Sequence, residues 1–346
     1  MRIVKDFDLS AFNTFRMKVR CACFVEYDSA KDLETLQWDA LPRPIKHIGG
    51  GSNLLFTGDF PGTILHSAIK YIKYVDMGFE DVPVMVGAGV LWDDFVAQTC
   101  SHGLWGAENL SLIPGEVGAA AVQNIGAYGV EVKDIISGVV CYDLQERRKV
   151  KFSVGECGYG YRESMFKHAS DRYIVTSVLI RLHRSYSPRL EYKGVRAALG
   201  LADDGSPEGL PPSQVRDAIV SVRRQKLPDP SELGSAGSFF KNPVVSALDF
   251  AHIIDVARRD FGSDVTIPHF INSDGTVKVP AAWMIDRCGF KGAVQGGAAC
   301  YEKQPLVIVN ASGAAAPSDI LALEDRIVEG VRSRFGLTLY PEVEHL

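Results

Sequence analysis

A long stretch of small, almost uncharged residues, 111–130, constrains this chain more than any other feature. Its glycines are Gly115, Gly118, Gly126 and Gly129. Glycine lets a backbone pass close to another surface, and N–H groups exposed in such a run can cradle an anion such as a pyrophosphate. A tightly packed glycine-rich connection would have the same composition, so this stretch alone leaves a ligand site and a packing device equally open.

A second glycine loop, from Gly49 to Asn53, follows an expected strand at 45–48. Its three successive glycines leave N–H groups with few local partners, and a bound anion is one way to satisfy them. A plain tight turn rarely needs three glycines, so we favour the ligand. Two such loops in the first half of the chain predict one dinucleotide bound between two lobes.

Other nucleotide-binding and catalytic motifs fit less well. An expected strand at 82–90 ends in G-x-G and precedes a helix at 92–100, which is similar to a Rossmann fingerprint. However, Trp92 occupies the third glycine position, and its bulk would block close contact between helix and strand. The sequence contains no G-K-[ST] of a P-loop, no G-x-S-x-G and no H-E-x-x-H.

Charge and cysteine usage exclude several classes of protein. The net charge of -5 argues against a general nucleic-acid or anionic-membrane binder. No uncharged apolar run reaches membrane-spanning length, and the first residues form no apolar signal region. The cysteines form no C-x-x-C pair, and no His/Cys cluster has zinc-ligand spacing. We therefore expect reduced thiols, no metal and a cytoplasmic protein.

The chain is long enough for two or three domains. A change of composition at residues 200–213, which are rich in Gly, Pro and Asp, is the best candidate for a boundary. Strands are expected near 135–144 and 173–182. Apolar residues three or four positions apart predict an amphipathic helix at 317–335, closed by Gly336.

Further motifs, ordered along nearly the whole chain, carry a more specific resemblance. They are Asn13-Thr14-Phe15, the loop at 49–53, and the segments 113–115, 123–129, 160–162, 226–230, 236–243, 280–286 and 341–343. Together they resemble the UDP-N-acetylenolpyruvoylglucosamine reductases, flavoenzymes of bacterial cell-wall synthesis, in the class with a substrate-closing tyrosine loop. Each glycine motif alone is weak, but the ordered set is specific.

The resemblance implies an α+β fold with two domains. A two-lobed FAD-binding domain of the vanillyl-alcohol-oxidase (PCMH) type would span residues 1–200, with lobes at about 1–70 and 71–200, and an α+β substrate-binding domain would span 210–346. The implied enzyme is a bacterial UDP-N-acetylmuramate dehydrogenase, which we expect to be a monomer. NADPH would reduce noncovalently bound FAD, which would pass hydride to UDP-N-acetylglucosamine enolpyruvate in peptidoglycan synthesis.

Three residues match the family's catalytic positions. Hydride added to the terminal CH₂ leaves negative charge on the neighbouring carbon and its carboxylate, which cations and donors should stabilise. By resemblance, Arg162 and Glu342 stabilise this enolate, and Ser238 donates the proton to the carbon. A planar guanidinium suits a carboxylate, and a positioned hydroxyl can protonate so basic a carbon. Without the motifs, Arg162 would more simply form a surface ion pair and Glu342 would be an ordinary charge near the C-terminus. Ser238 would be a turn or helix-capping serine.

The resemblance also assigns substrate and cofactor positions. The implied substrate residues are Tyr161, Tyr192, Lys226, Asn242 and Gln304, of which Tyr192 would close over the substrate. The implied cofactor residues are Gly49, Gly50, Gly51, Ser52, Asn53, Leu54, Ile113, Pro114, Gly115, Gly118, Ala119, Gln123, Asn124, Ile125, Gly126 and Tyr128.

Two alternatives remain. One is a sugar or hydroxy-acid oxidase of the same fold, in which His or Cys commonly binds flavin covalently; neither residue occurs in 49–53 or 111–130, which favours noncovalent FAD. The other is a non-catalytic UDP-sugar-binding protein, disfavoured by the presence of all three catalytic residues. The chain stops at Leu346, soon after Glu342, and a short tail would hold that glutamate loosely.

Overall fold

Two compact units make up the protein in this computed structural model, which describes residues 1–75, 78–185, 188–192, 194–202 and 209–346. The first unit consists of Met1–Asp8, Arg20–Gly50 and Phe60–Gln225. The second consists of Leu9–Val19, Gly51–Asp59 and Lys226–Leu346.

The units divide the chain at a different place from the expected boundary at 200–213. Helix α6 (Pro212–Lys226) belongs to the first unit up to Gln225, because its apolar side packs into that unit. Its buried residues Val215 and Ile219 lie in one apolar cluster with Trp105. Residues 203–208 of the expected boundary lie outside the described part of the chain.

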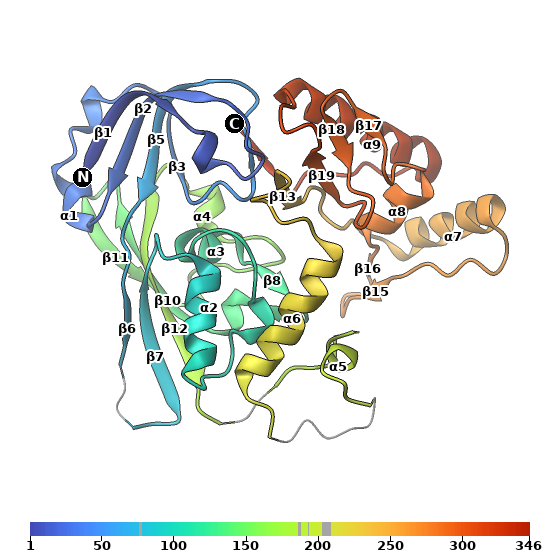
Figure 1. Ribbon diagram of the computed structural model, residues 1–346, viewed down its shortest axis with the longest axis horizontal. Coiled ribbons are helices and arrows are strands. Elements are labelled where there is room, and N and C mark those ends of the chain that lie inside the picture. The colour runs from blue at the N-terminus through green and yellow to red at the C-terminus, as the bar shows by residue number, and fades with distance from the viewer. Residues whose placement is uncertain (76–77, 186–187, 193, 203–208) are drawn as a thin grey trace. The chain divides into compact units, whose positions relative to one another are not determined.

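One sheet of the first unit mixes parallel and antiparallel strands. Its order is β1 (Arg2–Asp8), β2 (Arg20–Tyr27), β5 (Phe60–Ser67), β3 (Ile45–Ile48). Strand β1 is antiparallel to β2, whereas β5 runs parallel to both β2 and β3 (Figure 1). Because β3 ends at Ile48, the Gly49–Asn53 loop leaves this sheet directly from a strand end.

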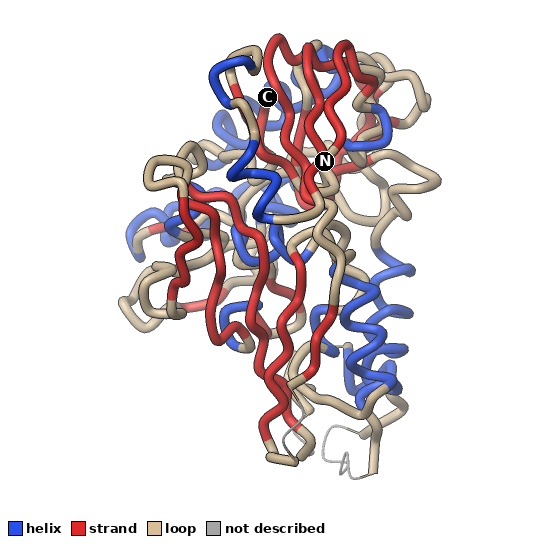
Figure 2. The backbone as a smooth tube through the Cα atoms, turned by 90° about the vertical axis from the view of Figure 1, so that its left-hand side faces the viewer, coloured by secondary structure: helices blue, strands red, loops and turns tan. Residues whose placement is uncertain are grey.

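The second sheet of this unit is antiparallel throughout, and Figure 2 shows its long strands running side by side. Its order is β11 (Arg148–Phe152), β10 (Ile136–Asp143), β12 (Tyr173–His183), β7 (Asp81–Gly87), β6 (Ile72–Tyr74). The strands expected near 135–144 and 173–182 are confirmed. A Rossmann site at β7 is excluded, because that fold needs parallel strands.

Helices α2 (Trp92–Ser101) and α3 (Val117–Gln123) share the main core of the first unit with this sheet. Trp92 is fully buried, and its Nε1 donates a hydrogen bond to Leu110 O at 2.8 Å. Glycine at 118 permits close packing, since a Cβ there would lie 2.8 Å from Ala88 Cβ. The shorter elements are α1 (Ala30–Thr35), η2 (Trp38–Ala40), η3 (Glu108–Leu110), β8 (Gly126–Ala127), β9 (Val130–Glu131), η4 (Val132–Asp134), α4 (Met165–His168) and α5 (Val195–Ala198).

The second unit is built on an antiparallel sheet covered by α9 (Pro317–Phe335). The predicted amphipathic helix is confirmed, with Ile320, Leu323 and Ile327 fully buried and Gly336 in a left-handed conformation at its end. The sheet order is β13 (Ser235–Ser238), β19 (Val307–Asn310), β18 (Ala298–Cys300), β17 (Val294–Gln295). The other elements are η1 (Ser10–Phe12), β4 (Leu54–Leu55), β14 (Val244–Val245), α7 (Ala247–Phe261), β15 (Phe270–Ile271), β16 (Val277–Lys278), α8 (Ala281–Arg287) and β20 (Glu344–His345).

The Asn13-Thr14-Phe15 motif is hydrogen-bonded to two strands of the second unit. Thr14 O accepts a hydrogen bond from Ser235 N at 2.9 Å, and Phe15 O accepts one from Asn310 Nδ2 at 3.0 Å. A Cβ on Gly234 would overlap the Phe15 carbonyl, so glycine allows this close approach. The motif therefore joins the N-terminal segment to both β13 and β19.

Gly234→Ala should destabilise the protein by about 2 kcal/mol or more, because its methyl group would collide with the Phe15 backbone. Gly58→Ala, in the same unit, is the control and should change the free energy of unfolding by less than about 0.5 kcal/mol, since a Cβ there meets nothing within 4 Å. Urea unfolding measures both. Equal effects of the two substitutions would contradict the close approach at Gly234.

Candidate active site

The two glycine loops predicted to hold the cofactor meet in the first unit. A Cβ built on Gly49 would lie 2.9 Å from Ala119 Cβ, and one on Gly50 would lie 3.8 Å from Gly115 Cα. The loops are therefore neighbours, as a shared dinucleotide site requires, and side chains at 49 would fill the space between them. The backbone of Gly49, Gly50 and Gly115 thus fits the close approach that a pyrophosphate needs.

A buried histidine between two carboxylates supports this junction. Glu116 is 6% exposed and lies beside Gly49, with Oε2 3.4 Å from the position of a Cβ there. His66 Nε2 lies 2.9 Å from Glu116 Oε1, and His66 Nδ1 lies 3.2 Å from Glu26 Oε1. This group was not predicted from the sequence, although Glu116 is the one charged residue in 111–130 and signals a specific partner.

Part of the 111–130 stretch serves packing. The N–H groups of Val117 and Gly118 donate to Val90 O and Ala88 O, both at 2.9 Å, so they are used within the protein. Asn124, fully buried, ends α3 in a left-handed conformation. Its Nδ2 donates to Gly160 O at 2.8 Å and to a carboxylate oxygen of Glu131 at 3.0 Å. The expected cradle of open N–H groups therefore does not include the first turn of α3.

Arg162 is anchored to the same stretch. Its Nη2 donates to Gly126 O at 3.0 Å and its Nη1 to Asn124 O at 3.3 Å. The guanidinium carbon lies 5.5 Å from the centre of the Tyr161 ring, which is 37% exposed. Arg162 has a φ of 57°, a conformation that costs a non-glycine residue energy and is often found at functional sites.

Tyr192 also contacts the glycine-rich stretch. Its ring packs edge-on against Tyr128, with ring centres 5.2 Å apart. Tyr192 remains 48% exposed. Tyr128 is partly buried, and this burial raises the pKa of its hydroxyl. The structure thus brings together Tyr128, predicted for the cofactor, and Tyr192, predicted for the substrate.

Ser238 and Glu342 lie on neighbouring backbone segments of the second unit. Glu342 N donates to Phe239 O at 2.8 Å. Since Phe239 directly follows Ser238 in the chain, this bond brings the two predicted catalytic residues close along the backbone. The Glu342 carbonyl accepts a bond from Asn53 Nδ2 at 3.0 Å. Ser238 is exposed at the end of β13, while the rings of Phe239 and Phe240 are buried behind it. The serine is therefore an exposed residue followed directly by two core residues.

The remaining predicted substrate residues belong to the second unit. Ser238 pairs with Val307, whose N–H donates to Gln304 O at 3.0 Å, so Gln304 lies in the turn next to Ser238. Asn242 Oδ1 accepts a hydrogen bond from Ala281 N at 2.9 Å, at the start of α8. Lys226 is exposed at the end of α6.

Behind Glu342, a buried carboxylate faces a histidine. His345 Nε2 lies 3.3 Å from Glu324 Oε2, close enough for an ion pair, although the contact lacks hydrogen-bond geometry. Glu324 is 8% exposed, and burial raises its pKa to about 7. Burial also lowers the pKa of His345. Neither residue was predicted from the sequence.

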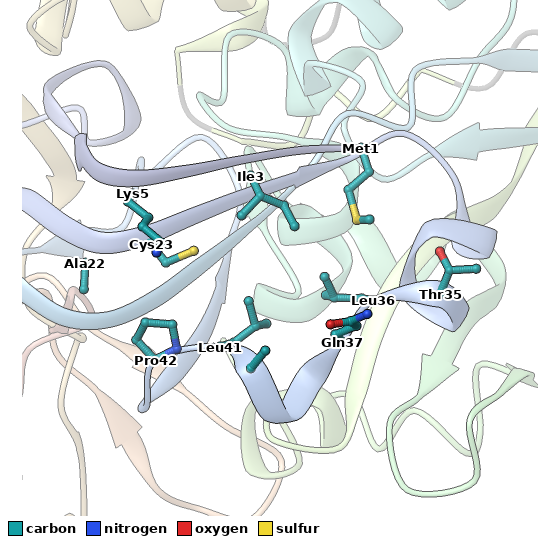
Figure 3. A pocket seen from close by; sticks show the side chains of 11 residues that line it. Met1, Ile3, Lys5, Ala22, Cys23, Thr35, Leu36, Gln37, Leu41 and Pro42 are labelled. Atoms are coloured by element: carbon teal, nitrogen blue, oxygen red, sulfur yellow. The ribbon is translucent and has the colours of Figure 1, made fainter.

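Other candidate sites are weak. A cavity of about 560 Å³ opens beside β1 and β2 and contains none of the predicted site residues (Figure 3). Its apolar lining includes Met1, Ile3, Leu36, Leu41 and Pro42. Within the described residues, His, Cys, Asp and Glu side chains form no group suited to a metal, and no helix is long and apolar enough to cross a membrane.

Comparisons with known proteins cover the whole chain. Residues 229–346 match the UDP-N-acetylenolpyruvoylglucosamine reductase C-terminal domain, and residues 22–145 match an FAD binding domain. The reductase of Bacteroides fragilis (strain YCH46) is 44% identical over 98% of this chain and 99% of its own. The reductase of Chromobacterium violaceum is 42% identical over 97% of both chains. The crystal structure of UDP-N-acetylenolpyruvylglucosamine reductase from Thermus caldophilus has the same fold, with a TM-score of 0.69, 23% identity and coverage of 100% of this chain and 99% of that one.

Glu324→Gln should make the free energy of unfolding less dependent on pH. Because the pKa of Glu324 is raised to about 7, the folded protein keeps a proton that the unfolded chain loses near pH 4.5, so stability falls between these values. Glutamine does not titrate, so the free energy of unfolding of the variant should increase relative to that of the wild type as the pH rises. Urea unfolding at about pH 5 and about pH 8 measures this change, with the exposed Glu329→Gln on the same helix as control. A difference that is constant with pH would rule out the titration.

Proposed function

Because this chain belongs to the UDP-N-acetylenolpyruvoylglucosamine reductase family, we propose that NADPH is its hydride donor and that Ser238, Arg162 and Glu342 carry out the chemistry. The enzyme is an FAD-dependent oxidoreductase of peptidoglycan synthesis, with an FAD-binding domain and the family's C-terminal domain. The alternatives of a sugar oxidase and a non-catalytic protein are therefore set aside.

The glycine loops support noncovalent binding of FAD. Gly49, Gly50 and Gly115 offer backbone without side chains where the loops meet, and Glu116 is held beside them by His66. Bound FAD supplies the hydride that adds to the terminal CH₂ of the enolpyruvyl group. The loops' part is to hold and orient the cofactor, while the selective chemistry belongs to other residues.

We assign the proton transfer to Ser238. Hydride and proton add across one carbon–carbon double bond, so the carbon next to the carboxylate must also receive a proton. Ser238 is exposed, so its hydroxyl is accessible, and its neighbour Phe239 is buried in the core of the unit. A positioned O–H can protonate a strongly basic carbon even though serine is a weak acid.

Arg162 and Glu342 then stabilise the charge that develops before that proton arrives. The Arg162 guanidinium is fixed by the carbonyls of Gly126 and Asn124, so it is oriented before a carboxylate binds. Glu342 would stabilise or protonate the enol form. The observation that carries this proposal is the hydrogen bond from Glu342 N to Phe239 O, because it keeps Glu342 beside Ser238.

The substrate's pyrophosphate and sugar need further partners. We propose Lys226, Asn242 and Gln304 as contacts in the second unit. In the first unit, Tyr161 and Tyr192 would contact the substrate, and both present exposed rings. The edge-on contact of Tyr192 with Tyr128 gives this tyrosine a defined resting position from which it would close.

Ser238→Ala should separate the two half-reactions. Reduction of FAD by NADPH should be nearly unchanged, whereas reoxidation by UDP-N-acetylglucosamine enolpyruvate should slow by about a hundredfold or more, because the proton donor is missing. Anaerobic reduction with NADPH, followed by rapid mixing with the substrate, measures both rates from flavin absorbance. Equal loss in both half-reactions would contradict the proton-donor role.

Arg162→Lys should also slow reoxidation, by about a hundredfold, because lysine keeps the charge but loses the planar fork that binds a carboxylate. Arg148→Lys on β11 is the control, since its side chain is 63% exposed and forms a surface ion pair with Glu146. The same rapid-mixing experiment applies. Turnover of Arg162→Lys close to that of the control would argue against carboxylate recognition by Arg162.

A further inference from the structure

Residues 340–346, here named the C-terminal segment, are held on two sides within the second unit. On one side, Lys241 N donates to Tyr340 O at 2.9 Å and Glu342 N donates to Phe239 O. On the other side, β20 pairs in parallel with β4, and Leu346 N donates to Leu55 O at 2.9 Å. A segment bonded along both edges has the geometry of an inner strand, so the tail is not loose as its shortness suggested.

Side chains anchor the far end of this segment. The Leu346 oxygen accepts bonds from Thr57 N at 2.7 Å and from Thr57 Oγ1 at 2.8 Å. The His345 ring lies 6.1 Å from the Phe239 ring, centre to centre, and its Nε2 faces Glu324 on α9. His345 thus lies between the residue that follows Ser238 and the helix that covers the sheet.

We propose that His345 is a positioning residue that, together with Thr57, holds Glu342 in place through the C-terminal segment. This inference rests on the proposed role of Glu342. An extended backbone transmits position well over the few residues between them, at about 3.3 Å per residue. Terminal residues fray unless they are tied down, and here the ties are a side-chain contact and a threonine hydroxyl.

The Phe239 backbone explains why this anchor bears on chemistry. Phe239 O accepts the Glu342 N–H, and the Phe239 ring contacts His345, so one residue adjoins Ser238, the glutamate and the anchor. Movement of the segment would shift the Glu342 carboxylate relative to the Ser238 hydroxyl. Displacements of about 1 Å in a catalytic group can cost about a hundredfold in rate.

His345→Ala should slow reoxidation of the reduced enzyme by the enolpyruvyl substrate about tenfold or more, while reduction by NADPH stays unchanged. Thr57→Val, which removes only the hydroxyl bond, should have a smaller effect in the same direction. His345→Gln should restore part of the rate, since its amide nitrogen can replace Nε2 beside Glu324. Tyr340→Ala is the control on the same segment, because its side chain is 68% exposed.

The decisive measurement repeats His345→Ala in a Glu342→Gln background. If His345 acts through Glu342, it should have no further effect there. The same fold-loss in both backgrounds would overturn the inference and leave His345 a general stabilising residue. If Glu342→Gln alone leaves reoxidation unchanged, the proposed role of Glu342 fails first, and the inference fails with it. Flavin content and thermal midpoints confirm that each variant is folded.

Discussion

Close backbone contact at glycine is the constraint on which both units depend. Gly118 brings α3 against Ala88, Gly234 brings β13 against the Phe15 carbonyl, and a Cβ on Gly51 would overlap the Phe12 carbonyl. A side chain at any of these three positions would collide with the neighbouring segment, so glycine is what lets the two segments pack at this short distance. Within the first unit such contacts fix α3, which follows the Gly115 turn, and within the second unit they fix β13, which ends at Ser238.

Sequence periodicity predicts the elements that bury one face. The strands at 136–143 and 173–183 and the helix at 317–335 follow from it, because burial of a continuous apolar side leaves a regular pattern. The ordered motifs predict the cofactor, the family and roles for Ser238 and Glu342 in one reaction. They do so by resemblance, since no local pattern places residues so far apart in the chain next to each other.

Which segments of the chain make up each unit could not be predicted from periodicity or motifs. Segments 9–19 and 51–59 join the second unit through hydrogen bonds such as those of Asn310 and Thr57, and these bonds link residues hundreds of positions apart. Pairing of that kind leaves no periodic signal. The Glu116–His66 contact could not be predicted for a similar reason, because neither residue belongs to a motif and only the fold brings them together. In the glycine-rich stretch, the N–H groups of Val117 and Gly118 bond within the protein, whereas Gly115 is proposed for the cofactor. Composition alone does not distinguish these two uses.

The pairing of β4 with β20 has a consequence for synthesis on the ribosome. Strand β4 emerges early, but its partner β20 emerges only after all the other elements of the second unit. Every segment of the first unit is available once Gln225 has emerged, so that unit can close while translation continues. The second unit cannot form until its later residues emerge, and its segments 9–19 and 51–59 stay unpaired until then. Pairing residues so far apart in the chain also costs loop-closure entropy, which slows folding. Glu342 is therefore set in place only after the other elements of the second unit have emerged.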